Sequence, residues 1–474
     1  MSSVANAVEK LRLVTSQHPI SGLAQAFSDA GHELALVGGP VRDAFLGREI
    51  NDLDFTTTAK PDEIEKIVQP LSSAVWDVGR AFGTIAAKIG TFTVEITTYR
   101  ADRYDGQSRK PEVAFGDRLE DDLFRRDFTM NAMALSLPDL VLVDPCDGLK
   151  DLLEGVLVTP IAPEESFADD PLRMMRAARF ASQLGVQVHP TTMEAMIALA
   201  PRIADISAER VRDELVRTLC TPDPRPGIEI LVDTGIADVV LPEIPALRLE
   251  ADEHAHHKDV YQHSLTVVKQ AIDEERRRFP DTEPNVVLRL AALLHDIGKP
   301  ATRKFEAGGT VTFYHHDVVG AKLAKKRLTA LRFDNDTIAA VCKLIELHLR
   351  FFGYSEQAWS DSAVRRYVRD AGDQLDLLHI LVRADVTTRN QRKADRLSFA
   401  YDDLENRIAE LAELEEIHSM RPELNGEQIM KILDISPGRA VGEAYAFLLE
   451  IRLEEGEIGE EEATLRLKQW WANK

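Results

Sequence analysis

The sequence predicts an α+β protein of several domains, with a small mixed β-sheet and helices at the N-terminus and all-helical domains after it. Short apolar runs that suit strands alternate with helical segments in residues 1–150, whereas the later apolar residues recur with helical spacing. A chain of 474 residues also exceeds what one hydrophobic core supports. We expect domains at 1–150, 151–245, 246–400 and 401–474.

Composition indicates a cytoplasmic protein. The three cysteines are far apart and form no ligand-like cluster, which fits a reducing compartment. No apolar run reaches the roughly 18 residues that a membrane span needs, so we expect no membrane association. The net charge of −22 disfavours general nucleic-acid binding, but basic residues gather locally, as in Lys322–Arg332. Any nucleic-acid partner would therefore depend on a few Arg and Lys residues.

Apolar runs, together with the glycine and proline residues that end or begin them, predict the elements of the first domain. Residues 1–33 are expected to be helical, and Gly38 ends the strand that follows. Pro40 suits the first turn of a helix. The expected strands are Leu34–Val37, Asp52–Thr57, Thr84–Ile89, Thr91–Thr98 and Leu140–Val143. The expected helices are Asp62–Leu71 and a segment from Arg125 to Met133, with a polar loop over residues 101–124 between them.

Helices are expected throughout the rest of the chain. The clearest are Leu172–Gly185, where Gly185 suits a C-cap, Thr191–Leu199 and Glu209–Leu219. A long histidine-rich helical region follows over about 254–390, and acidic helices complete the chain.

Two aspartates on one predicted strand form the first candidate site. Residues i and i+2 of a strand point to the same face, so Asp52 and Asp54 project together. Carboxylate oxygens are the ligands that Mg²⁺ prefers, and Glu95 on a neighbouring strand is a candidate third ligand. The turn at Gly38 and Gly39 lets backbone N–H groups approach phosphates.

The stretch LVGGPVRDAFLGREINDLDF, residues 36–55, resembles the signature of the DNA-polymerase-β-like nucleotidyltransferases. The similar branch contains bacterial tRNA CCA-adding enzymes and poly(A) polymerases. The resemblance implies that Asp52 and Asp54 hold Mg²⁺ for nucleotidyl transfer, and that Gly38, Gly39 and Arg42 contact the nucleotide.

Two later segments extend the resemblance. RRDFTMNAMA, residues 125–134, is similar to the branch's second motif, which implies nucleotide contacts by Arg126, Asp127 and Asn131. An Asp at this position can accept a hydrogen bond from a ribose 2′-hydroxyl.

DDPLR, residues 169–173, resembles the element that acts as an amino-acid template for the incoming base. Asp170 and Arg173 would read it, although Asp169 stands where the family usually has Glu. Arg176 and Arg179 follow on the same helix as further candidate nucleotide contacts, for which a structural or phosphate-facing role is favoured over base reading.

The histidine-rich region resembles an HD phosphohydrolase domain. LLHDIGK, residues 293–299, places a His-Asp pair in an apolar segment, where an unpaired charge is costly. The implied metal ligands are His263, His295, Asp296 and Asp385, with His316 and His348 as candidates for a second ion. The domain would bind a divalent transition metal and hydrolyse phosphomonoesters or 2′,3′-cyclic phosphates.

These resemblances leave three functions open. The first is template-independent addition of CCA to tRNA from CTP and ATP, which the HD region and the length of the 101–124 loop favour. The second is a poly(A) polymerase of the same branch. The third is an HD phosphohydrolase whose N-terminal domain only binds RNA. The sequence leaves monomer and homodimer equally open.

Overall fold

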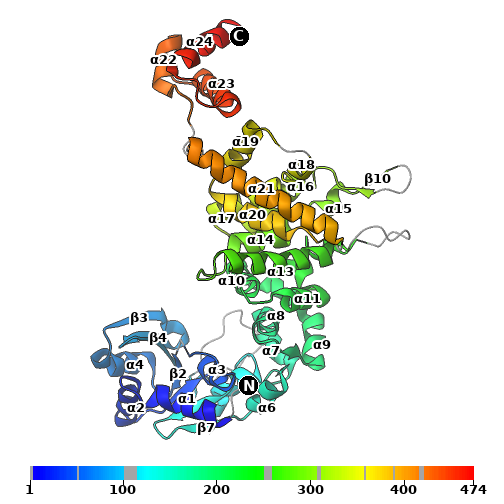
Figure 1. Ribbon diagram of the computed structural model, residues 1–474. Helices are drawn as coiled ribbons and strands as arrows, with labels where there is room; N and C mark the ends of the chain where they lie inside the picture. The colour runs from blue at the N-terminus through cyan, green and yellow to red at the C-terminus, as the bar shows by residue number, and fades with distance from the viewer. Residues whose placement is uncertain are drawn as a thin grey trace. The chain divides into compact units, whose positions relative to one another are not determined.

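The computed structural model describes residues 4–50, 53–100, 115–249, 259–306, 311–356, 359–387, 390–415 and 421–474. It forms two compact units, residues 1–240 and 241–474. The first unit is mixed α/β and the second is almost wholly helical (Figure 1). This confirms the predicted α+β class. The unit boundary lies near the predicted division at 245, while the predicted division at 400 falls inside a continuous helix.

The first unit is built on a seven-stranded mixed sheet with the order β3-β4-β5-β2-β1-β6-β7. Its strands are β1 Leu34–Val37, β2 Leu53–Thr57, β3 Ala74–Gly79, β4 Thr84–Ile89, β5 Phe92–Thr98, β6 Ala134–Leu137 and β7 Val141–Val143. Its β2–β5 pairing is parallel, and its other neighbours pair antiparallel. The sheet therefore brings the carboxylate-bearing strands side by side.

Helices pack around this sheet and bury its apolar side chains. They are α1 Val4–Ser16, α2 Ile20–Asp29, α3 Gly39–Phe45, α4 Pro61–Val68 and α5 Leu119–Phe124. Leu36, Phe55 and Ile96 are fully or almost fully buried between them. The central strands are thus a rigid platform for the polar residues that alternate with these core positions.

A helical neck completes the first unit. Its helices are α6 Gly148–Glu154, α7 Pro163–Asp169, α8 Leu172–Leu184, α9 Pro190–Leu199, α10 Ala208–Leu219, α11 Arg225–Asp233 and α12 Ile236–Val240. Two short strands, β8 Val156–Leu157 and β9 Gln187–Val188, pair in parallel. Helix α8 packs against α10 and α11 and ends at Gly185, whose φ of 70° suits the predicted glycine C-cap.

The second unit is a bundle of helices. They are α13 Val260–Arg278, α14 Val286–Leu294, α15 Lys299–Thr302, α16 His316–Ala330, α17 Asn335–Leu347, α18 Phe352–Glu356, α19 Asp361–Ala371, α20 Leu375–Ala384, α21 Gln391–Glu415, α22 Gly426–Leu433, α23 Arg439–Glu455 and α24 Glu460–Ala472. A small hairpin joins β10 Lys304–Phe305 to β11 Val311–Thr312. None of the described helices combines the length and apolar character that crossing a membrane requires.

Several local predictions were wrong. Residues 119–124, expected in the polar loop, form helix α5, and strand β6 at 134–137 was not expected. Residues from Arg125 to Met133 do not form the expected helix; they contain a single 3₁₀ turn, Thr129–Asn131, because the polar side chains there bond to other elements. Strand β3 was not expected. Most of its residues are exposed, so its sequence lacks the apolar alternation that marks a half-buried strand.

Candidate active sites

The first site begins at the glycine turn after β1. Gly38 has a φ of 76°, a conformation that L side chains rarely adopt. A Cβ built on Gly38 would lie 3.2 Å from Nη1 of Arg126, so a side chain would also crowd that guanidinium. The turn therefore needs glycine, and it leads directly into Gly39 at the start of α3.

Two carboxylates lie on adjacent strands beside this turn. Asp54 of β2 stands opposite Glu95 of β5 in the parallel register, and neighbouring strands are separated by about 4.8 Å. Leu53 and Phe55 flank Asp54 and are buried, so alternation turns the Asp54 side chain to the other face of the strand. Two carboxylates at this spacing fit a divalent cation. Asp52, the other predicted ligand, lies outside the described residues.

A chain of hydrogen bonds connects helix α3 to the second motif. Nη1 of Arg42 donates to Oδ1 of Asn131 at 2.7 Å, and Nδ2 of Asn131 donates to Oδ1 of Asp127 at 3.0 Å. Arg126 pairs with Asp122 at 3.1 Å. The structure thus brings together the predicted nucleotide-binding residues of the two motifs, although they are far apart in sequence.

The Asp127 carboxylate is already fully hydrogen-bonded by protein donors. Oδ1 accepts from the Phe128 backbone and from Asn131, and Oδ2 accepts from Nε and Nη2 of Arg176 at 2.8 and 2.6 Å. Burial alone would raise the pKa of Asp127, but the charge of Arg176 and the bond from Asn131 lower it to about 2. In this arrangement Asp127 positions Asn131 and Arg176, and its ribose contact stays a prediction.

The two candidate base-reading residues are held at the start of α8. Nη1 of Arg173 donates to Oγ of Ser166 at 2.8 Å, and its Nη2 donates to the carbonyl of Arg125 at 2.6 Å. Oδ2 of Asp170 accepts from Arg210 at 2.9 Å. Both side chains are therefore fixed in orientation before any base arrives.

Glu214 of α10 is a residue that the sequence did not single out. It is buried and pairs with Arg179 at 2.7 Å and with Arg176 at 3.7 Å. This supports a structural role for Arg176 and Arg179. A lone Glu on an amphipathic helix gives no sequence signal that it will be buried, because its partners come from another helix.

The second site gathers the six histidine and aspartate residues predicted as HD ligands. They form two adjoining sets, one of His263, His295 and Asp385 and one of Asp296, His316 and His348. Within each set one ligand atom per residue lies within 4.8 Å of the others. They come from α13, the ends of α14, α17 and α20, and the start of α16.

Hydrogen bonds fix the tautomers of three of these histidines. Nδ1 of His295, His316 and His348 each lies within 2.9 Å of the carbonyl three residues earlier. A carbonyl can only accept, so Nδ1 carries a proton and Nε2 is the ring atom that is left to bind a metal ion. The three Nε2 atoms are buried and make no hydrogen bond. Buried imidazole nitrogens facing carboxylates fit a metal site with the usual supporting bonds.

The pKa values of two of the imidazoles are shifted in opposite directions. Burial, helped by the neighbouring His295, lowers the pKa of His348 to about 4, which favours the neutral ligand form. Burial would also lower the pKa of His295, but the carboxylates of Asp296 and Asp385 raise it to about 10. The two carboxylates thus strongly stabilise a positive charge between them, and a bound metal cation can supply that charge.

Two further residues, which the sequence analysis did not single out, support this site. Oγ1 of Thr387 lies 3.0 Å from Nδ1 of His263, and Nζ of Lys299 lies 2.6 Å from Oδ2 of Asp296. Both follow predicted ligands closely in the chain.

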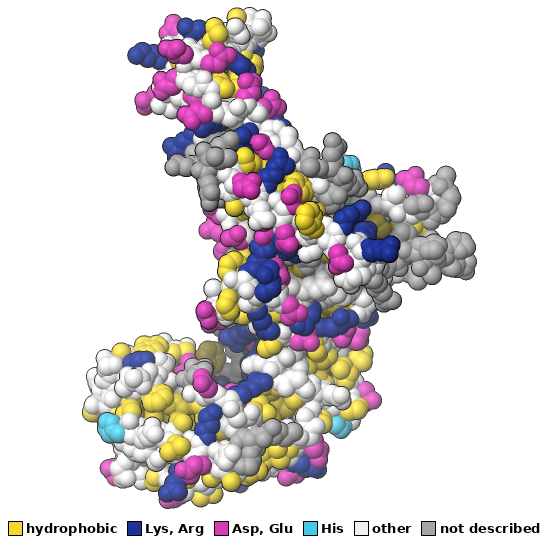
Figure 2. Space-filling model, in the orientation of Figure 1, with side chains coloured by type: hydrophobic (Ala, Val, Ile, Leu, Met, Phe, Trp, Pro, Cys, Tyr) yellow, Lys and Arg dark blue, Asp and Glu magenta, His cyan; other side chains and the backbone are white. Residues whose placement is uncertain are grey.

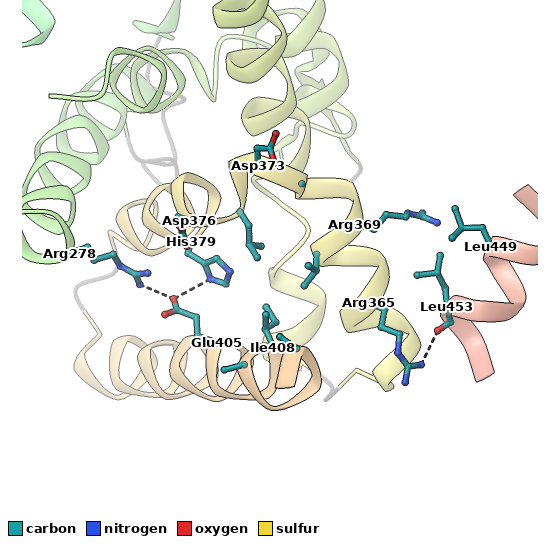
Figure 3. A pocket seen from close by; sticks show the side chains of 15 residues that line it. Arg278, Arg365, Arg369, Asp373, Asp376, His379, Glu405, Ile408, Leu449 and Leu453 are labelled. Atoms are coloured by element: carbon teal, nitrogen blue, oxygen red, sulfur yellow. Dashed lines mark hydrogen bonds and ion pairs between the residues drawn. The ribbon is translucent and has the colours of Figure 1, made fainter. Parts of the chain in front are cut away.

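A cavity of about 640 Å³ lies elsewhere in the second unit (Figure 3). Several of its polar groups are already paired: Glu405 bonds to His379 and Arg278, and Arg365 donates to the Leu453 carbonyl. It is therefore a weaker candidate than the two sites above.

Comparison with protein families matches three consecutive parts of the chain. A family described as the poly A polymerase head domain matches residues 34–158. One described as a probable RNA and SrmB-binding site of polymerase A matches 185–247, and the HD domain family matches 260–390. The HD match contains the six candidate ligands, and the head match contains the glycine turn, the two carboxylates and the second motif, whereas Asp170 and Arg173 lie between the first two matches.

Solved structures share the fold. The Bacillus stearothermophilus CCA-adding enzyme in complex with CTP aligns with a TM-score of 0.68 over 96% of this chain and 98% of its own, at 24% identity. The Thermotoga maritima CCA-adding enzyme complexed with tRNA aligns with a TM-score of 0.60 over 98% of both chains, at 19% identity.

Curated relatives match over nearly the whole length. An A-adding tRNA nucleotidyltransferase from Deinococcus radiodurans is 34% identical over 92% of this chain and 95% of its own. A CC-adding tRNA nucleotidyltransferase from Thermus thermophilus is 29% identical over 92% and 93%. A CCA-adding enzyme from Levilactobacillus brevis is 39% identical, but over 45% of this chain and 52% of its own. The full-length likeness to the Deinococcus enzyme shows that this protein is an enzyme of the tRNA nucleotidyltransferase family.

Proposed function

We propose that the chain rebuilds the complete CCA terminus of tRNA from CTP and ATP in the cytoplasm. The observation that carries nucleotidyl transfer is the register that sets Asp54 opposite Glu95 beside the glycine turn. The attacking 3′-hydroxyl of the RNA would bond to the α-phosphorus of the nucleotide, and pyrophosphate would leave.

Mg²⁺ is the cofactor that this site fits best, because Asp52, Asp54 and Glu95 offer only carboxylate oxygens. Bound there, it would stabilise the entering and leaving oxygens of the displacement. The protein's own residues bind and orient the nucleotide: Gly38 and Gly39 admit the phosphates, and Arg42 is fixed by Asn131.

Base choice is assigned to Asp170 and Arg173. An Asp supplies acceptors and an Arg supplies donors, so together they can satisfy the pairing edges of cytosine and adenine. Their prior fixation by Arg210 and Ser166 favours selection by hydrogen bonding.

Full CCA addition has to be distinguished from the narrower activities that the full-length relatives' names describe. Purified protein would be given tRNA lacking CCA, and tRNA lacking only the final A, with CTP and ATP singly and together. Sequenced products that gain CCA and then stop support the proposal. Extension of only one tRNA points to a CC-adding or A-adding enzyme, and an unlimited A tail points to a poly(A) polymerase.

We also propose that the HD site binds divalent transition metal ions and hydrolyses phosphate at RNA ends. The three buried Nε2 atoms beside two aspartates carry this proposal. Water would add across one P–O bond of a terminal 2′,3′-cyclic phosphate, leaving one free hydroxyl and one phosphomonoester.

The test compares variants of the HD site with a variant of the nucleotidyltransferase site. Asp385→Asn and His295→Ala should remove hydrolysis of 2′,3′-cyclic AMP by protein loaded with Mn²⁺ or Ni²⁺, while CCA addition persists. Asp54→Ala should do the reverse. Loss of both activities in either variant would contradict two separate sites.

A further inference from the structure

Three aromatic side chains of the second unit are unusually exposed. Phe399 is 74% exposed, Tyr314 66% and Phe305 64%, the three highest values among the large hydrophobic residues of the described chain. Tyr314 lies just before the candidate ligand His316, and Phe305 is on the hairpin that leads to it. Exposed aromatic rings are costly in water unless a partner covers them.

Helix α21, which carries Phe399, also carries exposed basic residues. Arg392, Lys393 and Arg396 are exposed, and none makes a hydrogen bond or ion pair through its side chain with a described residue. The acid among them, Asp395, accepts a bond from Gln391. Figure 2 shows Lys and Arg side chains gathered where α21 begins.

Several arginines of the second unit, among them Arg366, Arg383 and Arg407, have an acidic side-chain partner. Three neighbouring cations without one are positioned for an external anion.

Helical spacing aligns the basic and aromatic groups. Arg392, Arg396 and Phe399 follow the i, i+4, i+7 pattern of one helix face, and Leu397 is buried on the other side. From Arg392 to Phe399 the helix rises about 10 Å, roughly three stacked nucleotides at about 3.4 Å each. Cations that follow a backbone beside a ring that stacks on bases are typical of single-stranded nucleic-acid binding.

The same surface adjoins the metal ligands in the chain. Helix α20 ends at the candidate ligand Asp385, the chain then passes Thr387, which contacts His263, and α21 begins at Gln391. A strand held along the start of α21 would therefore have its end near the cluster.

We propose that Arg392, Lys393, Arg396 and Phe399 bind single-stranded RNA and deliver its terminal phosphate to the HD site. This rests on the proposed hydrolase function. It makes the substrate an RNA end rather than a free nucleotide.

The test compares two substrates of the metal-loaded full chain: a single-stranded RNA ending in a 2′,3′-cyclic phosphate, and 2′,3′-cyclic AMP. Phe399→Ala should lower kcat/KM for the RNA about fivefold or more, as removal of one stacking ring predicts. Values for cyclic AMP should stay within about twofold, because a mononucleotide does not reach the stacking ring. Phe399→Tyr should retain RNA hydrolysis, and Arg439→Ala, an exposed arginine on α23, is the matched control for charge.

Removing Arg392 and Arg396 together should also weaken the dependence of RNA affinity on salt, by about 0.7 in log–log slope for each phosphate left without its cation. Equal losses on both substrates, or none, would overturn the proposal. If neither substrate is hydrolysed, the proposed hydrolase function is contradicted, but the proposed RNA-binding surface is not. Fluorescence anisotropy with a short single-stranded RNA then tests that surface. Lower RNA affinity in the variants supports it, and unchanged affinity refutes it.

Discussion

At the scale of single residues, Asp54 is the sharpest test of the nucleotidyltransferase site. It is half-buried and stands opposite Glu95. Asp54→Ala should lower CCA addition by more than about 100-fold, since loss of even a supporting group at a metal site costs about 10–100-fold. Steady-state incorporation of labelled ATP and CTP measures this. Asp77→Asn, an exposed acid on β3, is the control and should leave the rate unchanged.

The lowered pKa of Asp127 predicts how the stability of the protein depends on pH. Its folded pKa of about 2 lies below the ordinary value, so the carboxylate contributes stability above about pH 4 and loses it as pH falls towards 2. The shift corresponds to about 2–3 kcal/mol. Asp127→Asn should therefore be less stable than wild type by a constant amount from pH 8 to 5, and the gap should narrow below about pH 4.5. Urea titrations of both proteins across this range test the sign, and a gap that widens in acid would contradict it.

At the scale of elements, the α7–α8 junction controls where the base-reading arginine points. Ser166 in the middle of α7 accepts a bond from Arg173, the second residue of α8. Ser166→Ala should free the guanidinium and reduce the preference for CTP over UTP about fivefold to tenfold, because one hydrogen bond contributes about 1 kcal/mol.

Competition assays with mixed nucleotides would measure that ratio. Ser166→Thr should restore it, since the hydroxyl is kept. A fall in kcat without any change in nucleotide preference would show that Ser166 serves folding alone.

The elements also show what the sequence could predict. Strand Leu34–Val37 and helix α8 follow local apolar periodicity, so both were predicted correctly. The segment from Arg125 to Met133 was not, because its polar groups bond to α3, α5 and α8 rather than along a helix. The six candidate ligands of the HD site were predicted from the resemblance to an HD domain, and the structure brings them together. Lys299 lies within that motif and pairs locally with Asp296, whereas the contact of Thr387 with His263 is tertiary and no local pattern records it.

At the scale of the whole molecule, the two sites lie in different compact units, which predicts that a metal ion stabilises one unit without the other. A ligand that binds only the folded state at a hundredfold excess over Kd adds about 2.7 kcal/mol. Mn²⁺ or Ni²⁺ should therefore raise the unfolding temperature of the unit spanning 241–474 and leave that of 1–240 unchanged.

Calorimetry of the full chain, with limited proteolysis to assign each transition, separates the two units. Asp385→Asn should abolish the metal-dependent shift, because it removes a carboxylate from the cluster, whereas Asp54→Ala should retain it. A shift that survives Asp385→Asn would place the stabilising ion outside the HD site. A metal-dependent rise in the unfolding temperature of both units together would show that they unfold as one cooperative body. Ligand binding at one site would then affect the stability of the unit that holds the other site.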